Sequence, residues 1–306
     1  MDPQTLTTGK ARRDPLRRLL HRNRWLLARR CIQIGLLLAF MAGPWWGVHW
    51  VHGTLASSKW FGLLPLSDPF VLLQSLAAGH WPELAAVLGA LLVAALYGLL
   101  AGRLYCGWVC PINMVTDVAA GLRRWIGLSG PGLAIDRRVR HLILLLALVG
   151  SAAFGTIAWE LVNPITLVQR AIVFGLSASG VIAAAAIFLF DLLVTRGGWC
   201  GHLCPVGAFY GWLGRRGRLR VVAARAEACT QCGDCYRACP EPHVIVPVLR
   251  PGDPAWSLGI EHQDCLRCGR CLDVCDEDVF VLRLGGTDTR RVEQPVNISQ
   301  RGPNRP

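Results

Sequence analysis

Two pairs of cysteines in the chain share one spacing. Cys106 and Cys110 lie four residues apart with a proline directly after the second, and Cys200 and Cys204 repeat this C-x3-C-P pattern. Because a residue before proline avoids helical geometry, the second cysteine of each pair is expected at a helix break. Two thiols cannot complete an iron–sulfur cluster, but all four together can form one thiolate site. Three interpretations stay open: a joint metal site, reversible disulfides or a thiol relay, and a structural role.

Eight further cysteines form two runs with the pattern C-x2-C-x2-C-x3-C, at 229–239 and 265–275. Bacterial ferredoxins bind two [4Fe–4S] clusters in this way, and the fourth cysteine of each run reaches the other run's cluster. The spacing predicts one cluster on Cys229, Cys232, Cys235 and Cys275, and a second on Cys265, Cys268, Cys271 and Cys239. Zinc fits less well, because its sites usually pair two C-x2-C knuckles. Structural disulfides are not expected in a reducing compartment.

The cysteine pairs follow long apolar stretches. The chain has 306 residues, of which 53% are hydrophobic, and a mean hydropathy of +0.38. A helix needs about 20 apolar residues to cross a bilayer. Four stretches without Lys, Arg, Asp or Glu meet this length, at 31–51, 84–102, 142–159 and 171–190. The composition therefore predicts a membrane protein.

Basic residues indicate the orientation of these spans. Residues 1–30 carry nine Lys and Arg and residues 103–140 carry six, whereas residues 52–83 contain only Lys59 and residues 160–170 only Arg170. Because short basic loops stay in the cytoplasm, both termini, both thiol pairs and the ferredoxin runs are expected there. The arginines beside the spans suit anionic lipid headgroups, so the net charge of +12 does not indicate nucleic-acid binding. An export signal is not expected either, since no small-residue cleavage site follows the N-terminal arginines.

The elements repeat along the chain. An apolar span, an outer loop, a second span and a thiol pair occur at 31–126 and again at 142–213. The expected fold is a polytopic α-helical membrane protein with four transmembrane helices in two hairpin repeats, followed by a C-terminal bacterial 2[4Fe–4S] ferredoxin-like α+β domain. The predicted segments are a basic tail at 1–30, the membrane domain at 31–213, a linker at 214–224, the ferredoxin domain at 225–286 and a disordered tail at 287–306. Val115, Val118, Leu122, Trp125 and Ile126 share one face of a helix expected to lie at the interface.

Several longer segments resemble one known family. They include GPWWGVHWVHG at 43–53, LPLSDPFVLLQSLAAGH at 64–80, YCGWVCP at 105–111, WELVNPI at 159–165, GWCGHLCPVGAFYG at 198–211, CPEPHV at 239–244 and CGRCLDVCDEDVF at 268–280. With the cysteine runs, they make the chain similar, from about residue 24 to 284, to the NapH family of membrane-bound ferredoxin-type quinol dehydrogenase components. A proline after the second run would fit the ferredoxin pattern, but Asp276 stands there.

The resemblance implies a location and partners in the bacterial inner membrane. It implies two [4Fe–4S] clusters, quinol as the electron source, and transfer with a NapG-type iron–sulfur protein towards periplasmic nitrate reductase. Relatives of the NosR and copper-oxidase-assembly types share the C-x3-C-P pairs, which leaves a redox or maturation role for another enzyme's metal centre as the alternative. Whether the chain is itself an enzyme, rather than an electron-transfer subunit, is left open by the sequence.

Quinol oxidation releases protons, so a quinol site needs an acid or an imidazole at the membrane edge. Glu160, Asp68 and His49 are the candidates. The simpler interpretation is that such residues cap helices and turns, as Asp68 before Pro69 would.

The orientation argument makes the first testable prediction. A reporter that is active only in the cytoplasm, fused after Arg220, should be active, and one that requires export should be silent, because the basic loops hold this side inside. The reverse pattern would place the cysteine runs outside the cytoplasm and refute the orientation.

Overall fold

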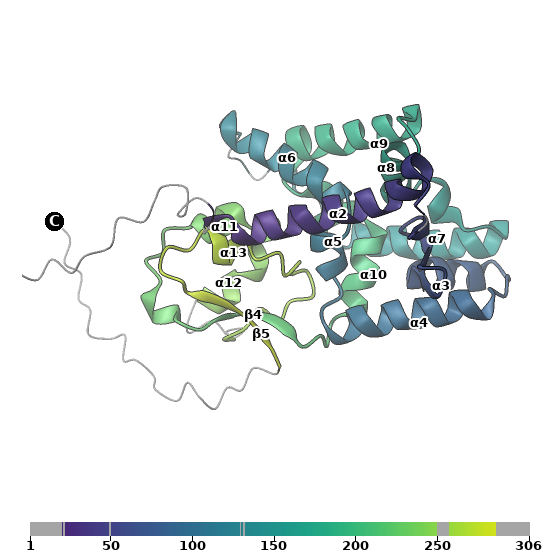
Figure 1. The fold of residues 1–306 in the computed structure, drawn as a ribbon. Helices are drawn as coiled ribbons and strands as arrows, with labels where there is room; N and C mark the ends of the chain where they lie inside the picture. The colour runs from purple at the N-terminus through teal and green to yellow at the C-terminus, as the bar shows by residue number, and fades with distance from the viewer. Residues whose placement is uncertain are drawn as a thin grey trace, which may run out of the picture.

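The computed structural model describes residues 20, 22–48, 50–128, 130, 132–249 and 257–285. His49, the predicted tail at 287–306 and most of the segment at 1–30 lie outside the described residues. A helical part and a cysteine-rich part lie at opposite ends of the molecule, and α2 (Arg24–Trp46) runs from one to the other (Figure 1).

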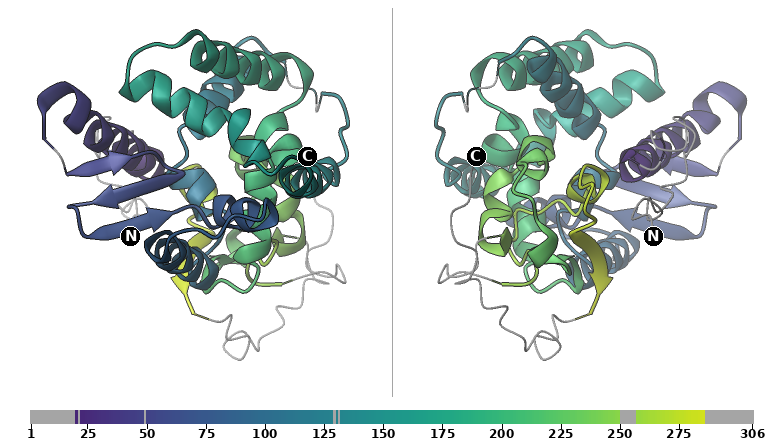
Figure 2. Two further views of the ribbon diagram at one scale, coloured as in Figure 1. Left: turned by 90° about the vertical axis from the view of Figure 1, so that its right-hand side faces the viewer. Right: turned by 90° about the vertical axis from the view of Figure 1, so that its left-hand side faces the viewer.

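The helical part contains two successive series of elements. Its other helices are α3 (Pro69–Ala77), α4 (Leu84–Leu99), α5 (Leu104–Trp108), α6 (Ile112–Trp125), α7 (Val139–Phe154), α8 (Pro164–Val173), α9 (Ala178–Leu189) and α10 (Pro205–Leu213), with the short turns η1 (Ala158–Leu161), η2 (Phe190–Val194) and η3 (Trp199–Leu203). A three-stranded antiparallel sheet of β1 (Val51–Gly53), β2 (Ser57–Trp60) and β3 (Leu64–Ser67) lies beside α2 on one flank (Figure 2).

Helix α2 is the one helix of the described residues that is long and apolar enough to cross a membrane. Shorter apolar helices of 10–17 residues cover Leu84–Leu99, Val139–Phe154, Pro164–Val173 and Ala178–Val194. The four predicted spans therefore stay a prediction. The fourth one, at 171–190, is wrong as a continuous helix. Gly175 has a φ of +108°, which few side chains tolerate, and the Ser177 side chain accepts a hydrogen bond from the Gly180 N–H to begin α9.

Helix α6 occupies the segment predicted to lie at the interface. Only part of its apolar stripe faces outward: Val118 is 61% and Trp125 83% exposed, whereas Val115 packs against the core. The opposite face buries Arg123, which donates to the carbonyls of Leu192 at 2.9 Å and Gly130 at 3.0 Å. A buried guanidinium needs such acceptors, so Arg123 joins α6 to the end of the second repeat.

Two matching segments tie the repeats together. The segment LSDPFVLLQ at 66–74 contains the residue that caps α3 and the first part of that helix. The segment LVNPITLVQ at 161–169 contains the same parts of α8. Each helix begins with proline after a capping residue, and each carries a buried glutamine, Gln74 and Gln169. The side-chain oxygen of Gln74 accepts from the Trp159 N–H at 2.9 Å, and that of Gln169 accepts from the Leu55 N–H at 2.8 Å. Each repeat thus satisfies a backbone group in the other repeat's outer loop.

The cysteine-rich part is built on a strand pair. Strand β4 (Leu219–Ala223) pairs antiparallel with β5 (Phe280–Leu284), from Leu219 opposite Leu284 to Ala223 opposite Phe280. Between them lie η4 (Ala226–Ala228), α11 (Asp234–Ala238), η5 (Pro242–Val244), α12 (Val246–Leu249) and α13 (Arg270–Asp273). The ordered domain therefore begins inside the predicted linker at 214–224, because Val221 and Val222 after the arginine-rich stretch are buried in its core.

The exchanged glutamines give the second prediction. Gln169→Leu and Gln74→Leu should each lower the free energy of unfolding by ~1–3 kcal/mol, because each leaves a backbone N–H buried without an acceptor. The loss appears as a lower melting temperature in detergent. Ser75→Ala on the same helix is the control, since the Ser75 side chain makes no hydrogen bond within the described residues. Glutamine variants that melt with the wild type would contradict the exchange.

Candidate functional site

The eight cysteines of the two runs line two separate cavities. One cavity of about 140 Å³ is lined by Cys229, Cys232, Cys235 and Cys275. The other is lined by Cys239, Cys265, Cys268 and Cys271. Each group combines three cysteines of one run with the fourth of the other, which is the division predicted from the spacing. We call them the outer set, which contains Cys229, and the inner set, which contains Cys265.

The loops around both cavities share a special backbone geometry. Gln231 and Arg267 have φ values of 58° and 50°, and Gly233 and Gly269 have 79° and 75°. These left-handed residues occupy matching positions in the two runs, where they turn the backbone around a central point. This backbone geometry is unfavourable for every residue except glycine. Its repetition in both runs fits loops shaped to enclose a cluster.

The donor chemistry also fits iron–sulfur clusters. Burial raises the pKa of the Cys235 thiol to about 11 and that of Cys271 well above its usual value. The chain alone therefore does not favour thiolates there, whereas a bound metal deprotonates a coordinating thiol. All eight cysteines are free of disulfides. The four thiols of each set are therefore the donors that a [4Fe–4S] cluster requires. The inner cavity, of about 20 Å³, would have to widen to admit one.

The two sets differ in exposure. Cys265, Cys268 and Cys271 of the inner set are each 8% exposed, whereas Cys232 of the outer set is exposed. The inner set lies towards the helical part, and one thiol of the outer set reaches the surface.

The two C-x3-C-P pairs lie together. Cys106, Cys110 and Cys204 are buried in one core cluster and Cys200 packs against it half-buried. Burial raises the pKa of Cys200, and the thiols of Cys204, Cys110 and Cys106 raise it further, so all four lie within electrostatic reach of one another. Cys204 is extended, with φ −71° and ψ 113°, and Pro205 begins α10 after it. The four thiols form what we call the junction set.

The junction set packs directly on the inner set. A Cβ atom added at Gly107 would lie 2.9 Å from the Leu266 carbonyl oxygen and 3.7 Å from the Cys268 Cβ. A Cβ added at Gly201 would lie 2.6 Å from Oε1 of Glu241, which follows Cys239 and Pro240. Each C-x3-C-P loop therefore needs its glycine to approach one half of the inner set.

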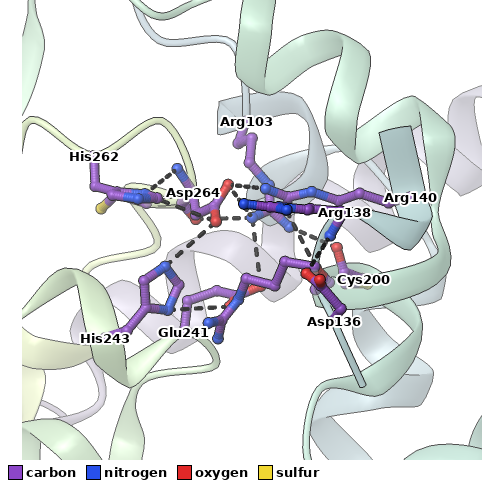
Figure 3. Close-up of polar contacts among 12 residues, drawn as sticks. Arg103, Asp136, Arg138, Arg140, Cys200, Glu241, His243, His262 and Asp264 are labelled. Carbon is purple, nitrogen blue, oxygen red and sulfur yellow. Dashed lines mark hydrogen bonds and ion pairs between the residues drawn. The ribbon is translucent and has the colours of Figure 1, made fainter. Parts of the chain in front are cut away.

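A buried arginine joins these groups (Figure 3). The Arg103 side chain is 0% exposed, and its guanidinium donates to the carbonyl oxygens of Cys200 at 2.7 Å and Asp264 at 2.9 Å. It also pairs with Glu241 at 3.4 Å and with the Asp264 carboxylate at 3.6 Å. Burial raises the pKa of Cys106, and the Arg103 guanidinium opposes that shift. Arg103 thus contacts both the junction set and the segments that carry the inner set.

Further charges complete the ion-pair group around Asp264. Arg140 pairs with its carboxylate at 2.5 Å, and Nε2 of His243 lies 3.3 Å from Oδ2. Burial alone would raise the pKa of Asp264, but His243, Arg103 and Arg140 hold it well below its usual value. The carboxylate therefore stays ionised in the interior.

Arg196, which precedes the second thiol pair in the chain, contacts the cysteine-rich part. The Arg196 guanidinium donates to the carbonyl oxygens of Arg237 and Cys239, the latter at 2.7 Å. At the other edge, Asp273 accepts from the backbone N–H groups of Trp25 and Leu26 at 3.0 Å, where an anion suits the helix N-terminus of α2. Both repeats and α2 therefore hold the cysteine-rich part.

Sequence reasoning missed Arg140, Glu241, His243 and Asp264. Glu241 and His243 lie in CPEPHV and Asp264 precedes Cys265, so adjacency to cysteines was the one available signal. Of the quinol candidates, Asp68 caps α3 through the Phe70 N–H at 3.0 Å, and Glu160 accepts from Asn163 at 2.9 Å. His49 lies outside the described residues.

Comparison with known sequences gives two kinds of similarity. Residues 83–129 and 176–222 match a family described as "4Fe-4S binding domain". These ranges contain the four junction cysteines and none of the other eight. No solved structure matches the chain.

Several curated proteins align with most of the chain. It is 48% identical to "Ferredoxin-type protein NapH" of Escherichia coli over 85% of the chain and 89% of that protein. It is 49% identical to "Methylamine utilization ferredoxin-type protein MauN" of Methylorubrum extorquens over 88% and 92%. A MauN protein of Methylobacillus flagellatus is 51% identical over 76% and 82%.

The buried arginine gives the third prediction. Arg103→Gln should destabilise the protein by ~3–5 kcal/mol, because it removes the fully buried guanidinium that pairs with both Glu241 and Asp264 and leaves each carboxylate with only part of its compensating charge. A lower melting temperature and faster proteolysis between the helical and cysteine-rich parts measure the effect. The control is Arg137→Gln, because the Arg137 side chain pairs with Glu241 from a site that is 38% exposed. Its loss should cost ~0–1 kcal/mol. Equal effects of the two variants would refute a special role for Arg103.

Proposed function

The chain belongs to the family of NapH and MauN ferredoxin-type proteins. On this premise we propose that it is the membrane subunit that receives electrons from quinol and passes them to an iron–sulfur partner of the NapG type, towards periplasmic nitrate reductase. A ferredoxin-type protein with 4Fe–4S-binding cysteines transfers electrons. When bound, a [4Fe–4S] cluster takes up and releases electrons at a potential set by its surroundings. The residues of the chain decide where such clusters lie.

One observation carries the proposal: the three cysteine sets lie in sequence through the molecule. The junction set packs on the inner set at Gly107, and the inner set shares the cysteine-rich domain with the outer set. The outer set, which includes exposed Cys232, is the one accessible to a protein partner. We therefore assign the surface around Cys232 to electron exchange with a protein on the cytoplasmic side of the membrane. Transfer to the NapG-type partner, which serves a periplasmic reductase, requires a separate route across the membrane.

We propose that the junction set holds a third metal centre. Its four cysteines fall in the ranges that match a 4Fe–4S binding domain, while the two other sets lie beyond them. Four thiols within electrostatic reach of one another are the donor number that a [4Fe–4S] cluster requires. Arg103 beside Cys106 offsets part of the negative charge that four thiolates would place in the interior.

The location follows the same reasoning. We place the protein in the bacterial inner membrane with several spans, and both termini and the cysteine-rich domain in the cytoplasm, because basic residues flank that side. The contacts of Arg103 and Arg196 with the cysteine-rich domain support this arrangement, since both arginines follow apolar helices on that side.

The alternative role is maturation, in which the chain reduces or assembles another enzyme's metal centre. The chain is about as similar to MauN, whose name refers to methylamine utilisation, as to NapH. Similar chains therefore serve different enzymes, and this observation supports the alternative role. Continuous reduction of an acceptor by quinol in purified membranes would support electron transport. Stoichiometric action with accumulation of an immature client would support maturation.

The joint junction site gives the fourth prediction. Cys106→Ala and Cys200→Ala should each abolish quinol-dependent reduction of the remaining clusters, and the double variant should be no worse than either single one, because members of one site fail as a unit. Each variant purified anaerobically should retain about eight iron atoms in the inner and outer sets. Cys31→Ala is the control, since this exposed thiol belongs to none of the three sets. Losses that simply add would show that the pairs act independently.

A further inference from the structure

A cavity of about 140 Å³ lies between α2, β2, β3, α4, α5 and α10. Its apolar lining includes Leu36, Phe40 and Val93. Its polar lining includes the Asp68 carboxyl and three tyrosines. An apolar protein cavity of about 150 Å³ binds benzene, so this cavity has room for a single aromatic ring.

The polar groups of the cavity meet at Asp68. Its Oδ1 atom accepts from the Tyr210 hydroxyl at 3.2 Å and from the Phe70 N–H at 3.0 Å. Asp68 is 7% and Tyr210 1% exposed. Burial raises the pKa of Asp68 to about 6, so the carboxyl is ionised at neutral pH and can accept hydrogen bonds. The cavity thus places a proton acceptor in an apolar wall.

The tyrosines provide flat surfaces. The rings of Tyr105 and Tyr210 stack at 4.7 Å with an interplanar angle of 10°, and Tyr97 meets both edge-on. Tyr105 precedes Cys106 in the chain, and Tyr105 and Tyr210 belong to the core cluster that contains Cys106, Cys110 and Cys204. The cavity therefore adjoins the junction set.

Helix capping does not explain the carboxylate. Asn163 occupies the matching position in the second repeat, where its side chain accepts from the Ile165 N–H at 3.1 Å before Pro164–Val173. Asn and Asp cap helices equally well. The first repeat therefore has an acid where the fold requires only an amide, and this acid lines the cavity.

We propose that this cavity binds the aromatic headgroup of quinol, with one hydroxyl of the ring donating a hydrogen bond to the Asp68 carboxylate. The inference rests on the proposed function, which supplies the substrate class. A quinol ring needs an apolar slot of its own thickness and an acceptor at its hydroxyl. Glu160, the other described acid considered for this role, is engaged by Asn163 and does not line the cavity.

The test measures binding of 1,4-hydroquinone to the full chain in detergent by equilibrium dialysis. Excess dithionite under anaerobic conditions keeps the ligand and the protein reduced, so binding is separated from turnover. Asp68→Asn should raise the Kd for the quinol about ten-fold or more, because it removes a charge-assisted hydrogen bond. In a separate dialysis without dithionite, it should raise the Kd for the oxidised quinone less, since a quinone carbonyl has no proton to donate. The fold should survive, as the second repeat already uses Asn163 at this position.

Two further variants make the test decisive. Val93→Phe fills the cavity without touching its polar groups and should also weaken binding about ten-fold. Glu160→Gln, an acid-to-amide control outside the cavity, should bind as the wild type. Quinol binding that is unchanged in Asp68→Asn and Val93→Phe would overturn this site while leaving quinol as the electron source. A wild-type chain that binds no quinol would refute both the site and the quinol part of the proposed function.

Discussion

The ion pairs of Arg103 with Glu241 and Asp264 are the contact on which the arrangement of the molecule depends. All three side chains are at most 3% exposed, so each charge has given up water and must be compensated by opposite charges, which Arg137 and Arg140 also supply to the carboxylates. The arginine directly precedes α5, and the carboxylates come from segments beside two cysteines of the inner set. The charges can be satisfied only when the helical and cysteine-rich parts are in contact. A pair of this kind specifies position more than it adds stability.

The internal repeat brings a loop from each half of the helical part against the inner set. The loops that begin at Cys106 and Cys200 place Gly107 and Gly201 against different halves of the inner set. Farther out, Gln74 and Gln169 exchange hydrogen bonds between the outer loops. The repeats are thus held together at both ends. The junction set consequently has a defined position in the fold.

The repeats are equivalent in fold and different in chemistry. Both short helices begin with a capping residue and proline, yet the first has Asp68 and the second has Asn163. Around Asp68, the stacked rings of Tyr105 and Tyr210 form a cavity wall next to the junction set. A duplicated framework can keep its packing while one copy acquires a charged group. This division places the candidate substrate site in the first repeat.

Local sequence patterns determined much of the grouping of cysteines and the boundaries of helices in this protein. Cysteine spacing grouped eight thiols as they line the two cavities, because a cluster loop is a short-range structure, while their role as cluster ligands stays a prediction. The proline after Cys204 placed a break where α10 begins. Hydropathy failed at 171–190, where a single left-handed glycine interrupts an apolar stretch. The junction of four thiols, the charge group at Arg103 and the cavity at Asp68 join residues far apart in the chain. No spacing rule encodes such contacts, since burial of unlike charges and the approach of two repeats are decided only when the whole chain packs.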